Sequence, residues 1–252
     1  MSSLMQQLTG GTKPADPTPP STEPLWPLPN VLITGESSTG KSYSFANMDW
    51  SRTAFIDTEI KGMPFPVNAD FMRNYYPCED HAQTMAAIKK VRQRADIRYV
   101  IIDGFTDFND KAMIHERRAN ASAKDGFAAY KANTDWIIQF LDACKSRKQI
   151  TIVTAIPETL TSTTDDGKGS ALLRRAKVQG REMEGAVERS FVYAFVTKVF
   201  PGAEKPADRH KFLTRTDGYS LAKAPAGAFD EQYIHNDMAA ILKVIESRIS
   251  KA

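Results

Sequence analysis

Residues 35–42, GESSTGKS, combine two glycines, one lysine and four small hydroxylated side chains. The spacing Gly-x-x-x-x-Gly-Lys-Ser is typical of a loop that binds polyphosphate, because glycine and small residues let several backbone N–H groups point inward. A helix starting at Lys41 would add partial positive charge. Lys41 would reach the β and γ oxygens, and Ser42 would offer its hydroxyl to Mg²⁺. The alternative is a chance glycine turn. The predicted phosphate-binding residues are Gly35, Glu36, Ser37, Ser38, Thr39, Gly40, Lys41 and Ser42.

Two carboxylates could complete a site for phosphoryl transfer, which needs an acid near Mg²⁺ and a group that positions the attacking water. Asp103 ends the apolar run YVIID, where an unpartnered carboxylate would be costly. It is predicted to bind magnesium; the alternative is a helix-capping aspartate. Gly104 follows it, where many phosphate-loop ATPases have glutamate. The second acid must therefore come from TAFIDTE (53–59), which offers Asp57 and Glu59. Glu59 is preferred, and its alternative is a surface acid in a turn.

Short apolar runs alternate with amphipathic stretches along the chain and must position these residues. Alternation of this kind predicts right-handed βαβ units, an α/β fold and a mostly parallel sheet flanked by helices. Ligands bind at the carboxyl ends of such strands, where residues 35–42 and Asp103 fall. The expected strands are 31–35, 53–59, 98–105, 149–156 and 189–200. The expected helices are 41–48, 81–95, 128–147 and 237–249, with a strand, a turn and a strand over 210–225.

Composition narrows the class of protein. The 252 residues are 42% hydrophobic and 25% charged, as in an ordinary globular protein, and the net charge of +3 leaves room only for a local basic patch. Cys78 and Cys144 lack metal-ligand spacing and favour reduced thiols in the cytoplasm. No apolar run approaches the ~20 residues of a membrane span. Residues 1–28 are rich in proline, threonine and serine and are predicted to be a disordered tail before one domain, 29–252.

GESSTGKS, TAFIDTE and YVIIDGF together resemble the phosphate loop, the catalytic-glutamate strand and the Walker B strand of RecA-like recombinase ATPases. The resemblance covers residues 30 to about 225 and is nearest to the compact phage ATPases of the Sak-type single-strand annealing group. It implies a RecA-like P-loop fold, to which the residue patterns of 210–225 and 237–249 add a C-terminal β-hairpin and helix. It also implies catalytic roles for Glu59 and Lys41, and Mg²⁺ held by Ser42 and Asp103. If the chain is phage-encoded, it would act in the host cytoplasm.

The resemblance departs from the family at the end of the fourth strand. RecA proteins usually carry a polar sensor there, often glutamine. In this chain Ala155 or Ile156 falls at that place. Thr154 or Glu158 could substitute for the sensor.

Two polar loops are where the resemblance implies contacts with single-stranded DNA. They would fall within residues 105–126 and 158–182. The second loop holds a cluster of cations that could neutralise backbone phosphates, although it has no aromatic residue for base stacking. The alternative is a solvated basic loop. The predicted DNA-binding residues are Lys168, Arg174, Arg175, Lys177 and Arg181.

Head-to-tail assembly is a further implication, since RecA-like ATPases bring a cation from one subunit to the γ-phosphate of the next. The matching stretch, HKFLTRTDG (210–218), offers Lys211 and Arg215 at even spacing on one expected strand. Arg215 is the predicted arginine finger, and a pair of solvent-facing charges on an edge strand is the alternative.

The sequence therefore predicts an ATPase that uses ATP and Mg²⁺ and acts on single-stranded DNA in recombination or annealing. Its predicted partners are DNA and further copies of itself, with a single-strand binding protein as a further candidate. Two other functions stay open: a nucleotide-gated scaffold with little turnover, and a P-loop NTPase or kinase acting on a small molecule.

Overall fold

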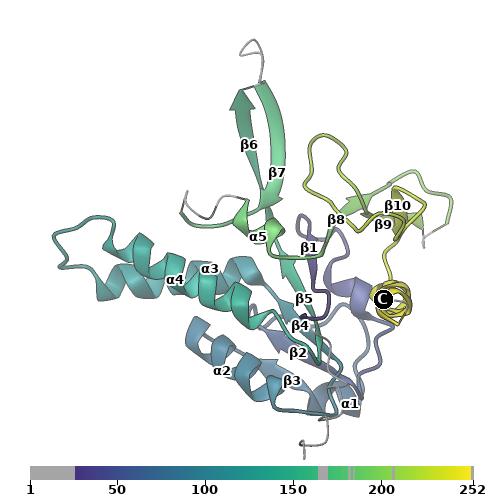
Figure 1. Ribbon diagram of the computed structural model, residues 1–252, viewed down its shortest axis with the longest axis horizontal. Helices are drawn as coiled ribbons and strands as arrows, with labels where there is room; N and C mark the ends of the chain where they lie inside the picture. The colour runs from purple at the N-terminus through teal and green to yellow at the C-terminus, as the bar shows by residue number, and fades with distance from the viewer. Residues whose placement is uncertain (1–25, 164–169, 181–182, 184, 206–207, 251–252) are drawn as a thin grey trace, which may run out of the picture.

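The computed structural model describes residues 26–163, 170–180, 183, 185–205 and 208–250 of the chain. Its centre is an eight-stranded sheet with the order β10-β9-β8-β1-β5-β4-β2-β3 (Figure 1). The strands from β8 to β3 are parallel, while β9 runs antiparallel to both β8 and β10. The strands are β1 (Val31–Thr34), β2 (Thr53–Asp57), β3 (Tyr75–Pro77), β4 (Tyr99–Asp103), β5 (Ile150–Ala155), β8 (Tyr193–Val199), β9 (His210–Leu213) and β10 (Tyr233–His235).

Helices cover both faces of this sheet because alternate residues of each buried strand point to opposite sides. Leu32 and Ile102 pack on one face with α2 (His81–Arg92), α3 (Phe105–Ala119) and α4 (Ala128–Ala143). Val31 and Ile101 pack on the other face, against α1 (Ala69–Arg73) and α6 (Met238–Ile249). A mostly parallel sheet with helices on both faces confirms the predicted α/β fold of a P-loop NTPase.

The helix after the phosphate loop is shorter than predicted. The sequence predicts a helix over residues 41–48, but a single 3-10 turn, η1 (Ser42–Phe45), follows the loop. Phe45 and Trp50 turn into the core on the α6 side, and Asp49 ends the segment by accepting hydrogen bonds from Ser51. The chain thus enters β2 after a turn instead of a full helix.

The prediction of a long DNA loop at 105–126 is wrong for most of its length, because α3 occupies Phe105–Ala119. Phe105, Phe108, Ala112 and Met113 recur at the helical period and are buried. The many polar residues between them obscure this apolar face in the sequence. Only residues 120–126 remain a connection, leading to α4.

The second expected DNA loop forms a projecting β-hairpin, β6 (Pro157–Thr163) with β7 (Ser170–Ala176) (Figure 1). The short α5 (Ala186–Arg189) follows and precedes β8. A C-terminal β-hairpin and helix are also present. Its strands are β9 and β10, however, while residues 219–225, predicted as the second strand, make only isolated bridges. Within the described ranges, the structure contains no helix with the length and apolar character needed to cross a lipid bilayer.

Candidate active site

The phosphate loop lies at the carboxyl end of β1, between β5 and β8. Gly35 is required by close packing, because a Cβ at that position would lie 1.7 Å from Oγ1 of Thr197 on β8. Gly40 has a φ of +96°, and a Cβ there would meet the side-chain amide of Asn236 at 2.5 Å. Asn236 donates to the Gly40 carbonyl at 2.9 Å. Both glycines of the motif are therefore needed for the observed conformation and packing of the loop.

Lys41 turns its ammonium back over this loop. Its Nζ donates to the carbonyl oxygens of Gly35 at 2.7 Å and of Glu36 at 2.9 Å. Burial lowers the pKa of Lys41, and Asp103 partly opposes that effect. The ammonium is thus held near the backbone of residues 35–40, where polyphosphate oxygens would offer it stronger acceptors than carbonyls.

Ser42 and Asp103 meet although 61 positions separate them in the chain. The Ser42 hydroxyl donates to Oδ2 of Asp103 at 2.9 Å. Thr154, at the end of β5, donates to Oδ1 of the same carboxylate at 2.5 Å. Asp103 is only 1% exposed, and this burial raises its pKa. A hydroxyl beside a buried carboxylate is an oxygen set suited to Mg²⁺, and such an ion would offset the cost of burying the charge.

Glu59 lies beside Asp103 at the neighbouring strand end. Gly104 leaves the room for it: a Cβ at residue 104 would come within 3.0 Å of Cγ of Glu59 and 2.3 Å of Oγ1 of Thr58. The glycine also has a φ of +112°, which side-chain-bearing residues rarely adopt. Glu59 thus occupies the space beside Asp103 that a side chain at position 104 would need.

Asp57, the other acid considered, has a different environment. It is fully buried; Oδ1 accepts the backbone N–H groups of Glu59 at 3.0 Å and Ile60 at 2.9 Å. Oδ2 accepts the hydroxyl of Tyr75 at 2.8 Å. These bonds make Asp57 the support of the turn that carries Glu59.

Lys61 is a further candidate active-site residue, which the sequence analysis did not identify. It forms an ion pair with Glu59. Burial alone would lower its pKa, but the hydrogen bond to Glu59 and the charge of Asp103 raise the pKa above its ordinary value. The signal in the sequence is its position two residues after the acid, although the residues GMP that follow make the segment look like an ordinary turn.

A cleft of about 640 Å³ brings these groups together, a volume suited to a small-molecule ligand. Its lining includes the phosphate-loop residues from Ser37 to Tyr43 except Thr39, together with Glu59 and Lys61. Ile156, Arg209 and His210 also line it. Of the sensor alternatives, Thr154 contacts Asp103, whereas Glu158 pairs with Arg175 at 2.9 Å.

The structure describes three of the five predicted DNA-binding cations. Lys168 and Arg181 lie outside the described residues. Arg175 is 7% exposed and ion-paired with Glu158, so its guanidinium is not presented to a DNA phosphate in this structure. Arg174 forms an ion pair with Glu36 of the phosphate loop. Lys177 forms an ion pair with Asp110, with 3.4 Å between its Nζ and Oδ2 of Asp110.

Lys211 and Arg215 do not share a strand as predicted, because β9 ends at Leu213. Lys211 pairs with Asp208 at 3.3 Å. Arg215 is exposed, donates to the carbonyl of Asp230 at 3.1 Å and does not line the cleft of its own chain.

Comparison with known proteins agrees with this geometry. No curated protein matches the chain significantly. The model of a family described as AAA domain matches residues 29–191, which include the phosphate loop, Glu59 and Asp103 and make up more than half of the 252 residues. The chain therefore belongs to this AAA domain family and contains a nucleotide-binding domain of the P-loop ATPase type.

Proposed function

We propose that the protein hydrolyses ATP with Mg²⁺ and couples hydrolysis to single-stranded DNA in recombination or annealing of the phage RecA-like kind. The observation that carries the proposal is that Lys41, Ser42 and Glu59 line one cleft and that Ser42 is hydrogen-bonded to the buried Asp103. Lys41 would bind phosphate oxygens, and Glu59 would accept a proton from the attacking water. Ser42 and Asp103 would hold Mg²⁺, which would neutralise phosphate charge.

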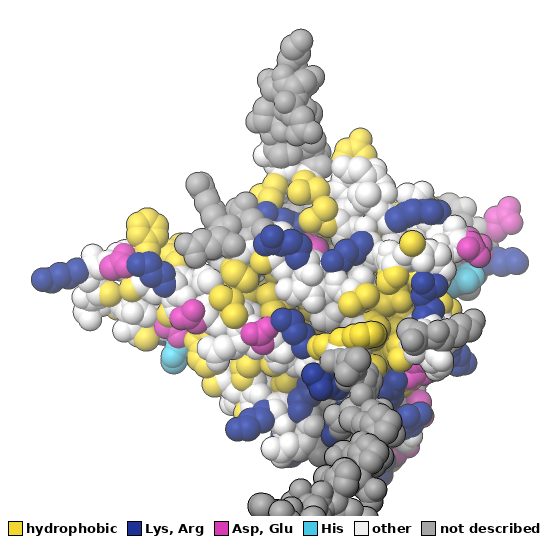
Figure 2. Space-filling model, viewed as in Figure 1, with side chains coloured by type: hydrophobic (Ala, Val, Ile, Leu, Met, Phe, Trp, Pro, Cys, Tyr) yellow, Lys and Arg dark blue, Asp and Glu magenta, His cyan; other side chains and the backbone are white. Residues whose placement is uncertain are grey.

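The β6–β7 hairpin supports the DNA half of the proposal. It leaves the sheet directly after Ile156, which lines the cleft, and its Arg174 is ion-paired with Glu36 of the phosphate loop. Lys and Arg side chains also gather below the hairpin on the face shown in Figure 2. A nucleotide that displaced Glu36 would change the contacts of Arg174 and so the hairpin that carries it.

Hydrolysis measured with and without single-stranded DNA tests the proposed function. We expect DNA to stimulate turnover, and we expect replacement of Arg174 and Lys177 by alanine to weaken DNA binding. The slope of log affinity against log salt should become shallower by roughly 0.7 for each DNA phosphate that the variant no longer neutralises. Alanine at Lys89 and Lys145, exposed lysines on α2 and after α4, is the matched control and should leave the slope unchanged.

The other outcomes separate the alternatives. Tight ATP binding without turnover would favour a scaffold, and stimulation by a metabolite alone would favour a small-molecule NTPase or kinase. Wild-type protein that has no DNA affinity at low salt with ATP present would refute the recombination function.

The charge that develops on the γ-phosphate calls for a cation, either from the same chain, where Lys61 and Arg209 line the cleft, or from Arg215 of a neighbouring subunit. We assign Arg215 to the site of the neighbouring subunit in a head-to-tail ring or filament. In agreement with this role, Arg215 does not line the cleft of its own chain. Mixing inactive Arg215→Ala with inactive Glu59→Gln protein should restore some hydrolysis, since some interfaces then pair an intact Glu59 with an intact Arg215.

The matched control mixes Lys41→Ala with Glu59→Gln. Both changes damage the subunit's own site, so no interface is complete and no activity should return. Co-assembly is checked by light scattering. If the Arg215→Ala mixture co-assembles and stays inactive, the shared site is excluded.

A further inference from the structure

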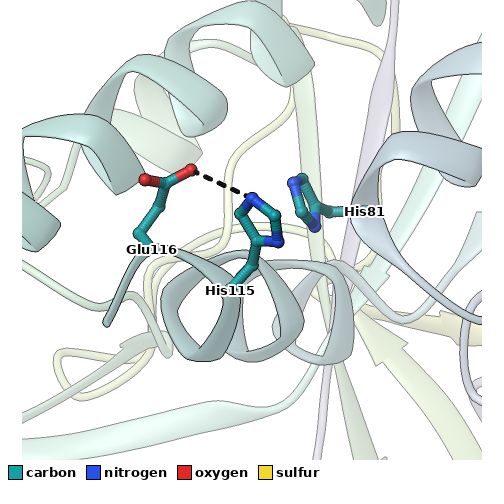
Figure 3. A group of neighbouring side chains, drawn as sticks. All are labelled: His81, His115 and Glu116. Atoms are coloured by element: carbon teal, nitrogen blue, oxygen red, sulfur yellow. Dashed lines mark ion pairs between the residues drawn. The ribbon is translucent and has the colours of Figure 1, made fainter. Parts of the chain in front are cut away.

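Three side chains that could ligate a metal converge away from the nucleotide cleft. His81 is the first residue of α2, while His115 and Glu116 lie in the last turns of α3 (Figure 3). One ligand atom from each lies within 4.8 Å of the others. We propose that these residues bind a divalent transition-metal ion such as Zn²⁺, which joins the start of α2 to the end of α3.

His81 supplies the strongest indication. It is 3% exposed, and its Nδ1 is buried with no hydrogen-bond partner among the described residues. Its ring packs edge-on against Trp136, with 4.5 Å between ring centroids, and lies 4.9 Å from the ring of His115. A buried imidazole that lacks a partner is costly, and a metal bound to the ring would offset that cost.

Glu116 is held in place by hydrogen bonds to both of its oxygens, each of which keeps a further lone pair. The indole Nε1 of Trp136 donates to Oε1 at 2.9 Å, and the Asn120 amide donates to Oε2 at 3.2 Å. Hydrogen bonds of this kind orient the carboxylate of a metal site. The Glu116 side chain is 12% exposed, so it faces a largely dry environment in which an unneutralised charge is unfavourable.

His115 completes the set from the solvent side. Its side chain is 60% exposed, and its Nε2 lies 4.0 Å from Oε1 of Glu116, between that carboxylate and the His81 ring in Figure 3. Ligand atoms in a tetrahedral zinc site are about 3.4 Å apart, so binding would draw these side chains closer together, and the exposed His115 ring is free to rotate toward the ion. Two imidazoles and a carboxylate suit Zn²⁺, Cu²⁺ or Ni²⁺ better than Mg²⁺.

The test is titration of the full-length, chelator-treated protein with ZnCl₂ in millimolar MgCl₂, which occupies sites made only of oxygen ligands. We expect one Zn²⁺ bound per chain by calorimetry and a rise in Tm of roughly 5 °C at saturation. Ni²⁺ should quench part of the tryptophan fluorescence, because Trp136 contacts two of the proposed ligands. None of these readouts depends on ATP hydrolysis.

Two variants decide the assignment. His115→Ala changes an exposed side chain, and Glu116→Gln keeps an acceptor for Trp136, so both should fold. Each should weaken Zn²⁺ binding at least ~10-fold and remove the Tm shift and the quenching. His235→Ala, an exposed histidine outside the cluster, should behave as wild type. Wild-type affinity in His115→Ala, or absence of Zn²⁺ binding by the native protein, would overturn the proposal.

Discussion

Replacement of Lys41 by alanine is expected to abolish nucleotide binding, with the dissociation constant of a non-hydrolysable ATP analogue rising at least ~100-fold, or roughly 3 kcal/mol. The Lys41 ammonium is held over the phosphate loop by two backbone carbonyls, so its position does not depend on the nucleotide. Lys61 and Arg209 also line the cleft, but Lys61 is paired with Glu59, and Lys41 is the residue that donates to the carbonyls of the loop. Calorimetric titration measures the effect.

Lys243→Ala, at an exposed position on α6, is the control for loss of one positive charge. It should bind the analogue as the wild type does. Thermal melting of both variants shows whether the fold is intact. A folded Lys41→Ala protein with unchanged affinity would remove the phosphate-loop assignment.

Replacement of Glu59 by glutamine is expected to preserve nucleotide binding and to slow hydrolysis by at least ~10²-fold, a typical contribution of a positioned base. The amide keeps the size of the side chain and loses its basicity. Single-turnover hydrolysis, with binding measured separately, distinguishes the two effects.

Asp57→Asn is the matched comparison, since it makes the same chemical change two residues away. Asp57 accepts three hydrogen bonds in the core, so its replacement should lower the free energy of unfolding by about 1–3 kcal/mol and affect turnover only through the turn that carries Glu59. If Asp57→Asn stops hydrolysis in a stable protein while Glu59→Gln does not, the two roles have been exchanged.

The parallel sheet and the ends of its strands were predictable because they depend on local patterns. β1, β2, β4 and β5 are apolar runs, and the residues that follow them fall at one edge of the sheet in any βαβ arrangement. The approach of Ser42 to Asp103 follows from that rule. The preference for Glu59 over Asp57 agrees with the hydrogen bonds that occupy both oxygens of Asp57.

Other features depend on contacts between distant residues. The sequence predicts a loop where α3 lies, because polar residues outnumber the buried Phe105, Phe108 and Met113. β3 is only three residues long, too short for a clear apolar pattern, and it is defined by its parallel pairing with β2. The ion pairs of Arg174 with Glu36 and of Arg175 with Glu158 depend on the folding of the hairpin, which no local pattern specifies.

The left-handed backbone of Gly104 restricts how this active site can evolve. A mutation that restored glutamate directly after Asp103 would strain the backbone and push its Cβ against Thr58 and Glu59. A side chain at position 104 and the present placement of Thr58 and Glu59 therefore exclude each other on this backbone. A Gly104→Glu variant is expected to fold less stably than the wild type and to displace Glu59 from its place beside Asp103.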